Sequence, residues 1–517
     1  MSKSFYITTA ISYPNGRPHI GHAYEAIAAD AIARFHRLTG RDVRLITGTD
    51  EHGLKMVQTA RDAGKSTIEL ADEMSSYFID MCDKLNIGYD GFRRTTEPAH
   101  HDASKALWKA MEASGDLYLD RYEGWYSVRD EGFYAEDELV MGEGGEKLSP
   151  QGTPVEWTAE ETWFFKLSKY QDKLLKLYDE HPEFIQPESR RNEVLRFVEG
   201  GLRDLSVSRT SFDWGVPVPG SPGHVMYVWV DALTTYMTGV GYPDTEGMFA
   251  KYWPADLHLI GKDIVRFHAV YWPAFLMSAG LPLPKQIFGH GFLLNRGEKM
   301  SKSVGNVVDP MALAEHFGVD QLRYFLLADV VFGKDGTYSA DAIVTKTNAD
   351  LANNFGNLAQ RSLSMIAKNC NGQVPAPGEA TAAEQELVTQ LDQCFDDVTA
   401  AMTGGLFKID AALDAIRERL SATNTYFADQ APWALRKTDP ARADTVLYYT
   451  AEAIRRLAIM LRWAIPESCD KMLDLLSQAE DARDFEHLAT AIETGLDLPA
   501  PQGVFPRLEL PKEEAEA

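Results

Sequence analysis

The first fifty residues alternate between strand and helix patterns in a way that limits the folds open to the chain. Residues 5–10 form a short apolar and β-branched run typical of a strand, and residues 23–38 carry apolar side chains at helical spacing. Gly40 is placed to end that helix, and residues 43–47 then read as a buried strand. Strand, helix and strand in this order predict a parallel sheet in an α/β domain.

The loop between the first strand and the helix, residues 14–22, has the composition of an anion site. Free backbone N–H groups and the positive end of the helix dipole face the same point there, which suits a phosphate. His19 and His22 are three residues apart, so both imidazoles can donate hydrogen bonds to a phosphate from one face. The alternative is a turn followed by two surface histidines, and these nine residues alone do not decide between the two.

A second stretch, residues 295–305, combines two lysines and two serines between glycines. This is the composition of a mobile clamp for a polyphosphate, although alone it is more typical of a solvated basic loop. The two stretches lie on either side of an α/β pattern. In this order, His19-Ile-Gly-His22 and Lys299-Met-Ser-Lys-Ser303 resemble the paired HIGH and KMSKS signatures of class I aminoacyl-tRNA synthetases.

Composition sets broad limits on location and partners. The chain has 517 residues, 45% of them apolar and 25% charged, which is typical of a globular protein with several domains. It shows no apolar run behind a basic start and no window near the length of a membrane span, so we expect a cytoplasmic protein without a membrane partner. The formal net charge of −25, taken alone, argues against a nucleic-acid partner, but a local basic face remains possible.

The cysteines give no sign of a disulfide framework or a zinc site. Four of them lie far apart without a C-x-x-C pair, which fits reduced thiols: Cys82, Cys370, Cys394 and Cys469.

Asp50 follows the second predicted strand. In parallel sheets ligands bind beyond the carboxyl ends of the strands, so the loops after the first and second strands are expected to face one crevice. Asp50 is therefore a candidate for binding a substrate ammonium group, the alternative being a cap of the next helix. Helices are predicted after the capping box at residues 66–69 and over residues 98–114. His100 and His101 point about 100° apart on the latter, and we interpret them as ordinary surface or packing residues.

From about residue 116 the pattern changes to short aromatic strands and Gly-rich turns, followed by a helix-like run at residues 160–178. We interpret this segment as an insertion of about a hundred residues into the sheet. The α/β pattern resumes near residue 225, where residues 224–231 and 256–261 read as strands. Ile264, His268 and Trp272 then form a helical stripe, for which core packing is the simplest explanation.

Nearly everything after residue 348 reads as helix, which predicts a separate helical bundle. The apolar periodicity is clearest over residues 387–402, 409–427 and 445–465. We expect five segments: catalytic domain, first half (1–115), connective insertion (116–224), catalytic domain, second half (225–285), KMSKS and stem-contact region (286–347), and helical anticodon-binding domain (348–517).

Among class I enzymes the chain resembles the methionyl-tRNA synthetases over essentially its whole length, with further matching blocks at residues 227–233, 260–264 and 429–433. The resemblance implies a Rossmann-like parallel-sheet catalytic domain with an inserted connective subdomain and an all-α bundle. It also implies activation of L-methionine with ATP to methionyl-adenylate, then transfer to tRNA(Met). Mg²⁺ is expected with ATP. No DNA partner is expected.

The resemblance further assigns roles to residues. His19, His22, Lys299 and Lys302 would be catalytic, and Arg209 would lie near the reacting groups. ATP would be bound by Gly21, Glu25, Gly261, Lys262, Asp263, Ser301 and Lys302. Methionine would lie among Ala10, Ile11, Tyr13, Asp50, Trp229, Ala232, Leu233, Tyr236, Ile264, His268 and Trp272, where a thioether gains from aromatic contacts. The anticodon would be read by Asn357, Arg361 and Trp433.

There are two departures from the family pattern. Residues 126–130 and 148–151 lack the zinc-knuckle cysteines that many members carry, so we expect no zinc and an insertion held by its own small core. The chain also lacks the extra C-terminal dimerisation module of some relatives, so we expect a monomer.

Three alternatives remain open at this stage. Synthetases for isoleucine, valine or leucine share the layout but carry a larger editing insertion. A simpler nucleotidyltransferase would lack the helical bundle. A non-catalytic tRNA-binding paralogue would not need both phosphate motifs and the pocket aromatics.

Overall fold

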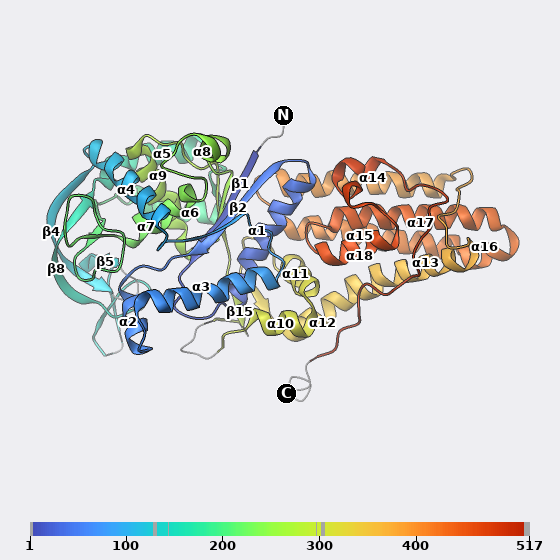
Figure 1. The fold of residues 1–517 in the computed structure, drawn as a ribbon, viewed down its shortest axis with the longest axis horizontal. Helices are drawn as coiled ribbons and strands as arrows, with labels where there is room; N and C mark the ends of the chain where they lie inside the picture. Colours follow the sequence, from blue (N-terminus) through green and yellow to red (C-terminus); the bar gives the residue numbers. More distant parts are fainter. Residues whose placement is uncertain (1–3, 128–131, 143, 296, 301–305, 511–517) are drawn as a thin grey trace.

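A six-stranded parallel sheet forms the centre of the catalytic half (Figure 1). The computed structural model describes residues 4–127, 132–142, 144–295, 297–300 and 306–510. The strand order is β3-β2-β1-β13-β14-β9, and every neighbouring pair is parallel. The strands are β1 (Ser4–Ser12), β2 (Asp42–Thr49), β3 (Gly91–Arg94), β13 (Leu257–Gly261), β14 (Ile287–His290) and β9 (Ile185–Gln186). The strand order reverses between β1 and β13, which is where such sheets bind ligands.

Helices cover this sheet, and the helix starts predicted after Ser66 and at Pro98 are confirmed. They are α1 (Ile20–Leu38), α2 (Leu54–Asp62), α3 (Thr67–Lys84), α4 (Pro98–Ala113), α7 (Val228–Thr238), α8 (Gly247–Tyr252) and α9 (Trp272–Ala279). The capping box of α3 is present, because Ser66 accepts from the backbone of Glu69 and Glu69 accepts from that of Ser66. Helix α1 begins three residues earlier than expected, since His19 caps it.

The insertion is a separate antiparallel sheet in the order β10-β8-β4-β5. Besides β9, the strands and α-helices in this part of the chain, from residue 117 to residue 226, are β4 (Leu117–Ser127), β5 (Gly132–Tyr134), β6 (Val140–Met141), β7 (Lys147–Leu148), β8 (Glu156–Phe165), α5 (Gln171–Glu180), α6 (Glu188–Glu199), β10 (Leu205–Ser206), β11 (Ser208–Arg209) and β12 (Val225–Met226). Strand β9 lies inside the range 116–224 yet pairs with β14 in the main sheet. The domain boundaries expected from the sequence therefore stay a proposal.

Two predicted elements were wrong. Residues 224–231 are not one strand: β12 ends at Met226, and α7 begins at Val228. Nearly every side chain of α7 is buried, and a helix buried on all sides gives the same continuous apolar run as a buried strand. Residues 160–178 are not one helix either, because β8 pairs with β4 along its whole length and α5 begins only at Gln171. Tertiary pairing outweighs local pattern there.

A helical bundle forms the other half of the elongated molecule (Figure 1). Between the halves lie β15 (Leu293–Asn295), β16 (Glu298–Lys299), β17 (Gly336–Tyr338), α10 (Pro310–Phe317), α11 (Val319–Ala328) and α12 (Ala340–Thr347). The bundle comprises a π-helix, η5 (Asn348–Gly356), then α13 (Asn357–Asn369), α14 (Ala382–Thr403), α15 (Ile409–Gln430), α16 (Pro432–Thr438), α17 (Pro440–Leu461) and α18 (Pro466–Leu475). The helical bundle expected after residue 348 is thereby confirmed. The prediction was wrong for the described residues after α18, up to residue 510, where two short 3₁₀ turns interrupt an otherwise irregular segment: Glu480–Ala482 and Phe485–Ala489.

A buried arginine joins the two halves. The Arg323 guanidinium on α11 donates to the Asp30 carboxylate on α1 at 2.6 Å and to the carbonyl of Ala464 after α17 at 2.9 Å. Both charged side chains are fully buried. Breaking such a pair leaves an uncompensated charge, so this contact fixes α1 against the end of the bundle.

Candidate active site

The phosphate loop ends in a histidine pair that caps α1. His19 Nδ1 accepts from the backbone N–H of Gly21 at 3.0 Å, and His22 Nδ1 accepts from that of His19 at 3.1 Å. Since both Nδ1 atoms are acceptors, a neutral ring of either residue carries its proton on Nε2. The two rings lie 3.9 Å apart at the N-terminal end of the helix dipole. Capping thus makes Nε2 the donor nitrogen of each neutral ring, a tautomer that sequence spacing alone did not show.

Gly21 is required at its position because the His19 ring folds over it. A Cβ there would meet Cε1 and Nδ1 of His19 at 2.8 and 2.9 Å. We expect Gly21→Ala to displace the ring and to slow the amino-acid activation that the family resemblance implies by about tenfold, with a small change in thermal stability. Pyrophosphate exchange and thermal unfolding measure the two effects. Gly503→Ala is the control, because a Cβ at Gly503 meets nothing within 4 Å; equal activity of the two variants would contradict this role.

The segment that follows the second motif meets the start of α1. The backbone N–H of Ile20, in the first turn of α1, donates to the carbonyl of Val308 at 3.0 Å. Met300 is buried in the same core as α1. Ser301 and Lys302 lie outside the described residues, and for Lys299 only the backbone, in β16, is described. The chain around Val308 therefore packs against the start of α1, nearly three hundred positions earlier.

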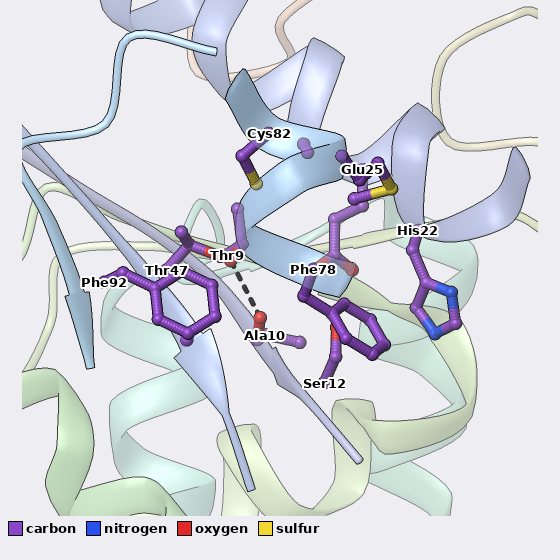
Figure 2. Close-up of a pocket in the computed structure, with 12 residues that line it drawn as sticks. Thr9, Ala10, Ser12, His22, Glu25, Thr47, Phe78, Cys82 and Phe92 are labelled. Atoms are coloured by element: carbon purple, nitrogen blue, oxygen red, sulfur yellow. Dashed lines mark hydrogen bonds between the residues drawn. The ribbon is translucent and has the colours of Figure 1, made fainter. Parts of the chain in front are cut away.

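A pocket opens at the carboxyl ends of β1 and β2, beside α1 and α3 (Figure 2). His22 and Glu25 reach it from α1, and Ala10 lines it from β1. Phe78 of α3 meets the His22 ring edge-on at 5.2 Å. This pocket lies at the strand ends where the sequence predicts a crevice, but neither Asp50 nor the loop before His19 lines it, so the crevice between the two loops stays a prediction.

Glu25 is held by two neighbours at this edge. Its carboxylate faces His290 Nε2 at 2.8 Å and accepts from the backbone of Ala10. His290 ends β14, and its Nδ1 donates to the Gly291 carbonyl at 2.8 Å. Burial alone would lower the pKa of His290, but the hydrogen bond and charge of Glu25 outweigh burial and raise it. His290 was not identified from the sequence, because no motif there marked it.

The residues predicted for the nucleotide on β13 lie at its carboxyl end. Lys262 Nζ is 2.8 Å from both carboxylate oxygens of Asp335 and lies 4.5 Å from the centre of the Phe292 ring. Gly261 is the last residue of β13, and Asp263 follows in a 3₁₀ turn. The charge of Asp263 contributes to raising the pKa of both Glu25 and His290. Lys262 is thus already paired with Asp335. To contact a nucleotide, its ammonium group would have to leave this carboxylate or bind the carboxylate and the nucleotide together.

An aromatic cluster lies next to the crevice, between α7 and the π-helix η4 (Phe267–Tyr271). Tyr236 Oη lies 2.6 Å from His268 Nε2, and His268 Nδ1 lies 2.9 Å from the carbonyl of Ile264. Because that carbonyl only accepts, Nδ1 carries the proton and Tyr236 donates to Nε2. Burial lowers the pKa of His268 to about 4, so the ring is neutral near pH 7. Trp229 stacks on Phe267 at 3.9 Å.

The other predicted pocket residues surround this cluster, with one exception. Trp272 is fully buried and donates to His258 Nε2 at 3.3 Å, while Ala232 and Leu233 are buried in α7. Ala10 and Ile264 pack against the same core, and Ile11 is half-buried in β1. Tyr13 instead packs against a small cluster under α2, where its hydroxyl accepts from the Met56 backbone at 3.2 Å.

Asp50 is buried directly after β2, where its backbone N–H donates to Ser12 of β1 at 2.9 Å. Burial raises the pKa of Tyr236, and the charges of Glu25, Tyr6 and Asp50 raise it further. The effect of Asp50 indicates that its carboxylate lies near the aromatic cluster. The two residues after Asp50 are buried and bound by side chains, Glu51 by Arg94 and His52 by Asp231. No sequence pattern indicated these contacts, since the partner of His52 is 179 residues away.

The chain matches a family model described as tRNA synthetases class I (M) over residues 5–363. A second model, the anticodon binding domain of methionyl tRNA ligase, matches residues 374–516. The methionine–tRNA ligase of Brucella suis biovar 1 (strain 1330) is 60% identical over 98% of both chains. The chain belongs to the methionyl-tRNA synthetase family. It is a methionine–tRNA ligase, an ATP-dependent enzyme that joins methionine to tRNA(Met) by way of methionyl-adenylate.

Solved methionyl-tRNA synthetase structures agree with this assignment. The Mycobacterium tuberculosis enzyme in complex with methionyl-adenylate is 58% identical, with a TM-score of 0.95 over 98% of this chain and 100% of that one. The apo form of the same enzyme has a TM-score of 0.90 at 55% identity, over 99% of each chain. The expected fold class is thereby confirmed.

Arg209, which the family resemblance placed near the reacting groups, is buried in β11 rather than open to the crevice. Its Nη1 donates to Ser206 Oγ at 2.8 Å and to the Ser208 carbonyl at 2.7 Å. Its guanidinium lies 4.6 Å from the centre of the Tyr227 ring, at the start of α7. Its described contacts therefore join β11 to the residue that precedes α7.

The expected anticodon residues of this synthetase gather at the end of the bundle. Trp433 in α16 is 44% exposed, and its ring meets Phe427 at 5.7 Å. The Arg361 guanidinium on α13 lies 5.2 Å from the Phe427 ring centre and 5.3 Å from that of Trp433. Asn357 is one helical turn before Arg361 on the same helix. The three side chains thus come from helices that meet at one site.

Where many family members carry zinc-knuckle cysteines, hydroxyl groups meet instead. Thr153 Oγ1 lies 2.6 Å from Ser127 Oγ and 2.8 Å from Ser149 Oγ, and all three residues are buried. In the part of the chain that the structure describes, no three His, Cys, Asp or Glu side chains form a potential metal site. Among the same residues, no helix is both long and apolar enough to cross a membrane. The expectation of no zinc stays a prediction.

Proposed function

We propose that methionine activation takes place in the crevice between β1, β13 and the start of α1, with the residues expected from the sequence. The observation that supports this proposal is the contact of Ile20 with Val308, which holds the segment shortly after the lysine motif against the first turn of α1. The methionine carboxylate attacks the α-phosphate of ATP, and pyrophosphate leaves. Catalysis then comes from positioning and from charge stabilisation by His19, His22, Lys299 and Lys302. In the second step the tRNA ribose hydroxyl attacks the activated carbonyl and loses its proton, the bond between the carbonyl carbon and the phosphate oxygen breaks, and AMP leaves with methionine esterified to the tRNA.

The nucleotide is proposed to lie along Glu25, Gly261 and Asp263, with Gly21 and Ser301 facing its phosphates. Mg²⁺ would accompany ATP and neutralise phosphate charge. The described residues offer no cluster of three potential ligands, which fits an ion held mostly by phosphate oxygens and water. We further propose a monomer that acts in the cytoplasm, where ATP and tRNA are available, with no DNA or membrane partner.

Methionine is proposed to place its ammonium group at Asp50 and its side chain among Trp229, Tyr236, His268 and Trp272. Neutral His268 and the Tyr236 hydroxyl keep the slot uncharged, which suits a thioether. The pocket assignment is tested by Asp50→Asn. We expect the methionine KM in pyrophosphate exchange to rise about a hundredfold while the ATP KM stays within about twofold, because only an ammonium contact is lost. An unchanged methionine KM would contradict the assignment.

Acid is expected to destabilise the fold through His268. Burial lowers its pKa from 6.5 to about 4, so between these pH values the unfolded chain binds a proton that the folded chain does not. Stability is therefore lost as pH falls from 6.5 towards 4, by about 2 kcal/mol at pH 5. The free energy of unfolding in urea, at pH 7 and pH 5, measures this loss.

The matched variant for this measurement is His268→Gln. Its free energy of unfolding should fall by about 2 kcal/mol less than that of the parent between pH 7 and pH 5. His290, whose pKa is raised, acts in the opposite direction but is present in both proteins. The same loss in parent and variant would show that His268 titrates normally.

A further inference from the structure

We infer that Asp231, together with His52 and His100, is a positioning group that holds the α7 wall of the methionine pocket against the ammonium site after β2. The inference rests on the pocket proposed above and adds to it three residues that do not themselves touch the substrate. Asp231 is thus a positioning residue, which acts on the substrate only through the segments that it holds together.

Three segments meet at the Asp231 carboxylate. Its Oδ2 lies 2.6 Å from Nδ1 of His52, in the loop after β2, and its Oδ1 lies 2.6 Å from Nε2 of His100 on α4. Asp231 and His100 are fully buried, and His52 is 4% exposed. Both carboxylate oxygens are thus used, and the network has little access to water.

The Asp231 carboxylate is charged in this arrangement. Burial opposes its ionisation, but the charge on His52 and the hydrogen bonds from His100 and His52 outweigh burial and hold its pKa far below the ordinary value. A buried carboxylate with two imidazole partners fixes the relative position of all three segments, because moving any one leaves a buried charge unpaired.

The two ends of the network are next to the proposed substrate contacts. His52 is two residues after Asp50, the proposed ammonium ligand. Asp231 is in the first turn of α7, between Trp229 and Ala232, which face the proposed methionine slot. A shift of α7 relative to β2 would therefore change the distance between the ammonium and side-chain subsites.

An ion pair with Arg94 anchors Glu51, the residue between Asp50 and His52. The Glu51 carboxylate accepts from Arg94 at 2.6 and 3.0 Å and from the Thr49 hydroxyl at 2.7 Å. Trp214 Nε1 donates to the Glu51 carbonyl at 2.7 Å. Asp50 thus precedes two consecutive anchored residues, of which Glu51 is joined to β3 and His52 to α7. Of these two anchors, the His52 anchor joins the segment after Asp50 to α7, which carries the proposed pocket wall.

The test is Asp231→Asn in the full chain, assayed by pyrophosphate exchange at varied methionine and varied ATP. We expect the methionine KM to rise about tenfold or more while the ATP KM stays within about twofold, because the network does not contact the phosphate loop. Glu384→Gln is the matched control. Glu384 is also a fully buried carboxylate, paired with Arg442 in the bundle, and its loss should leave both KM values unchanged.

A second pair of variants addresses His52 without removing the buried charge. Asparagine places an amide N–H where the imidazole has Nδ1, so His52→Asn keeps a donor to Asp231, whereas His52→Ala does not. We expect His52→Asn to stay within about threefold of the parent methionine KM and His52→Ala to match Asp231→Asn. In the double variant Asp231→Asn, His52→Ala the effect should equal that of either single change, since one network is lost once.

Additive effects in the double variant, or equal rises of both KM values in Asp231→Asn, would overturn the inference and leave a structural role only. Asp50→Asn separates this failure from a failure of the pocket itself. If Asp50→Asn raises the methionine KM and Asp231→Asn does not, the pocket stands and the positioning role is wrong. If neither variant changes it, methionine binds elsewhere and both proposals are wrong.

Discussion

Replacing His22 with asparagine is expected to slow methionyl-adenylate formation by about 10²- to 10³-fold, the usual cost of removing one donor to a transition-state charge. The two nitrogens of His22 have different tasks. Nδ1 accepts from the backbone of His19 at 3.1 Å and caps α1, whereas Nε2 carries the proton proposed to face the phosphate. The asparagine side-chain oxygen replaces Nδ1 and has nothing at the position of Nε2. The fold should therefore keep its stability while the rate falls.

His22→Gln is the matched variant because its amide reaches the Nε2 position but leaves the His19 backbone N–H without its cap. We expect an activity within about tenfold of the parent and a loss of stability of about 1 kcal/mol, the ordinary value of an N-cap. Single-turnover adenylate formation and thermal unfolding measure the two quantities. If both variants lost activity equally, the ring as a whole, and not its outer nitrogen, would be required.

Local patterns predicted the fold well wherever the signal is local. The capping box at Ser66, the end of α1 near Gly40 and the long bundle helices depend on residues three or four apart, and all are present. The run that became α7 was misread because burial on every side removes helical periodicity. Strand β8 was misread because its partner β4 lies some forty residues earlier, so only pairing reveals it.

The site was predictable in its motifs but not in its supports. His19 and His22 stand out by spacing, whereas Asp231, His52 and His100 are joined across 179 and 131 residues. His100 was interpreted as a surface or packing residue from its angle to His101, and the structure shows it fully buried against Asp231. Histidines become informative only when their partners are known, since the same ring donates, accepts or carries charge according to its neighbours.

Trp433→Ala is expected to lower kcat/KM for tRNA charging by one to two orders of magnitude, since stacking on an aromatic ring contributes about 1–3 kcal/mol per base. Trp433 is 44% exposed, and its ring is supported by Phe427 on one side and by the Arg361 guanidinium at 5.3 Å. An unstacked anticodon base is proposed to lie on this ring. Helix α16 is at the far end of the bundle from the sheet, so adenylate formation should not change (Figure 1).

Two controls separate stacking from general damage to the bundle. Trp433→Phe keeps an aromatic face and should retain most of the charging rate. Leu406 is similarly exposed, at 42%, and lies at the opposite end of α15, so Leu406→Ala should leave both reactions unchanged. If Trp433→Ala also lost adenylate formation, the indole would instead be required for the folding of the whole chain. Because the two reactions are measured on one protein, a selective loss of charging assigns this end of the bundle to the tRNA and the crevice to the amino acid.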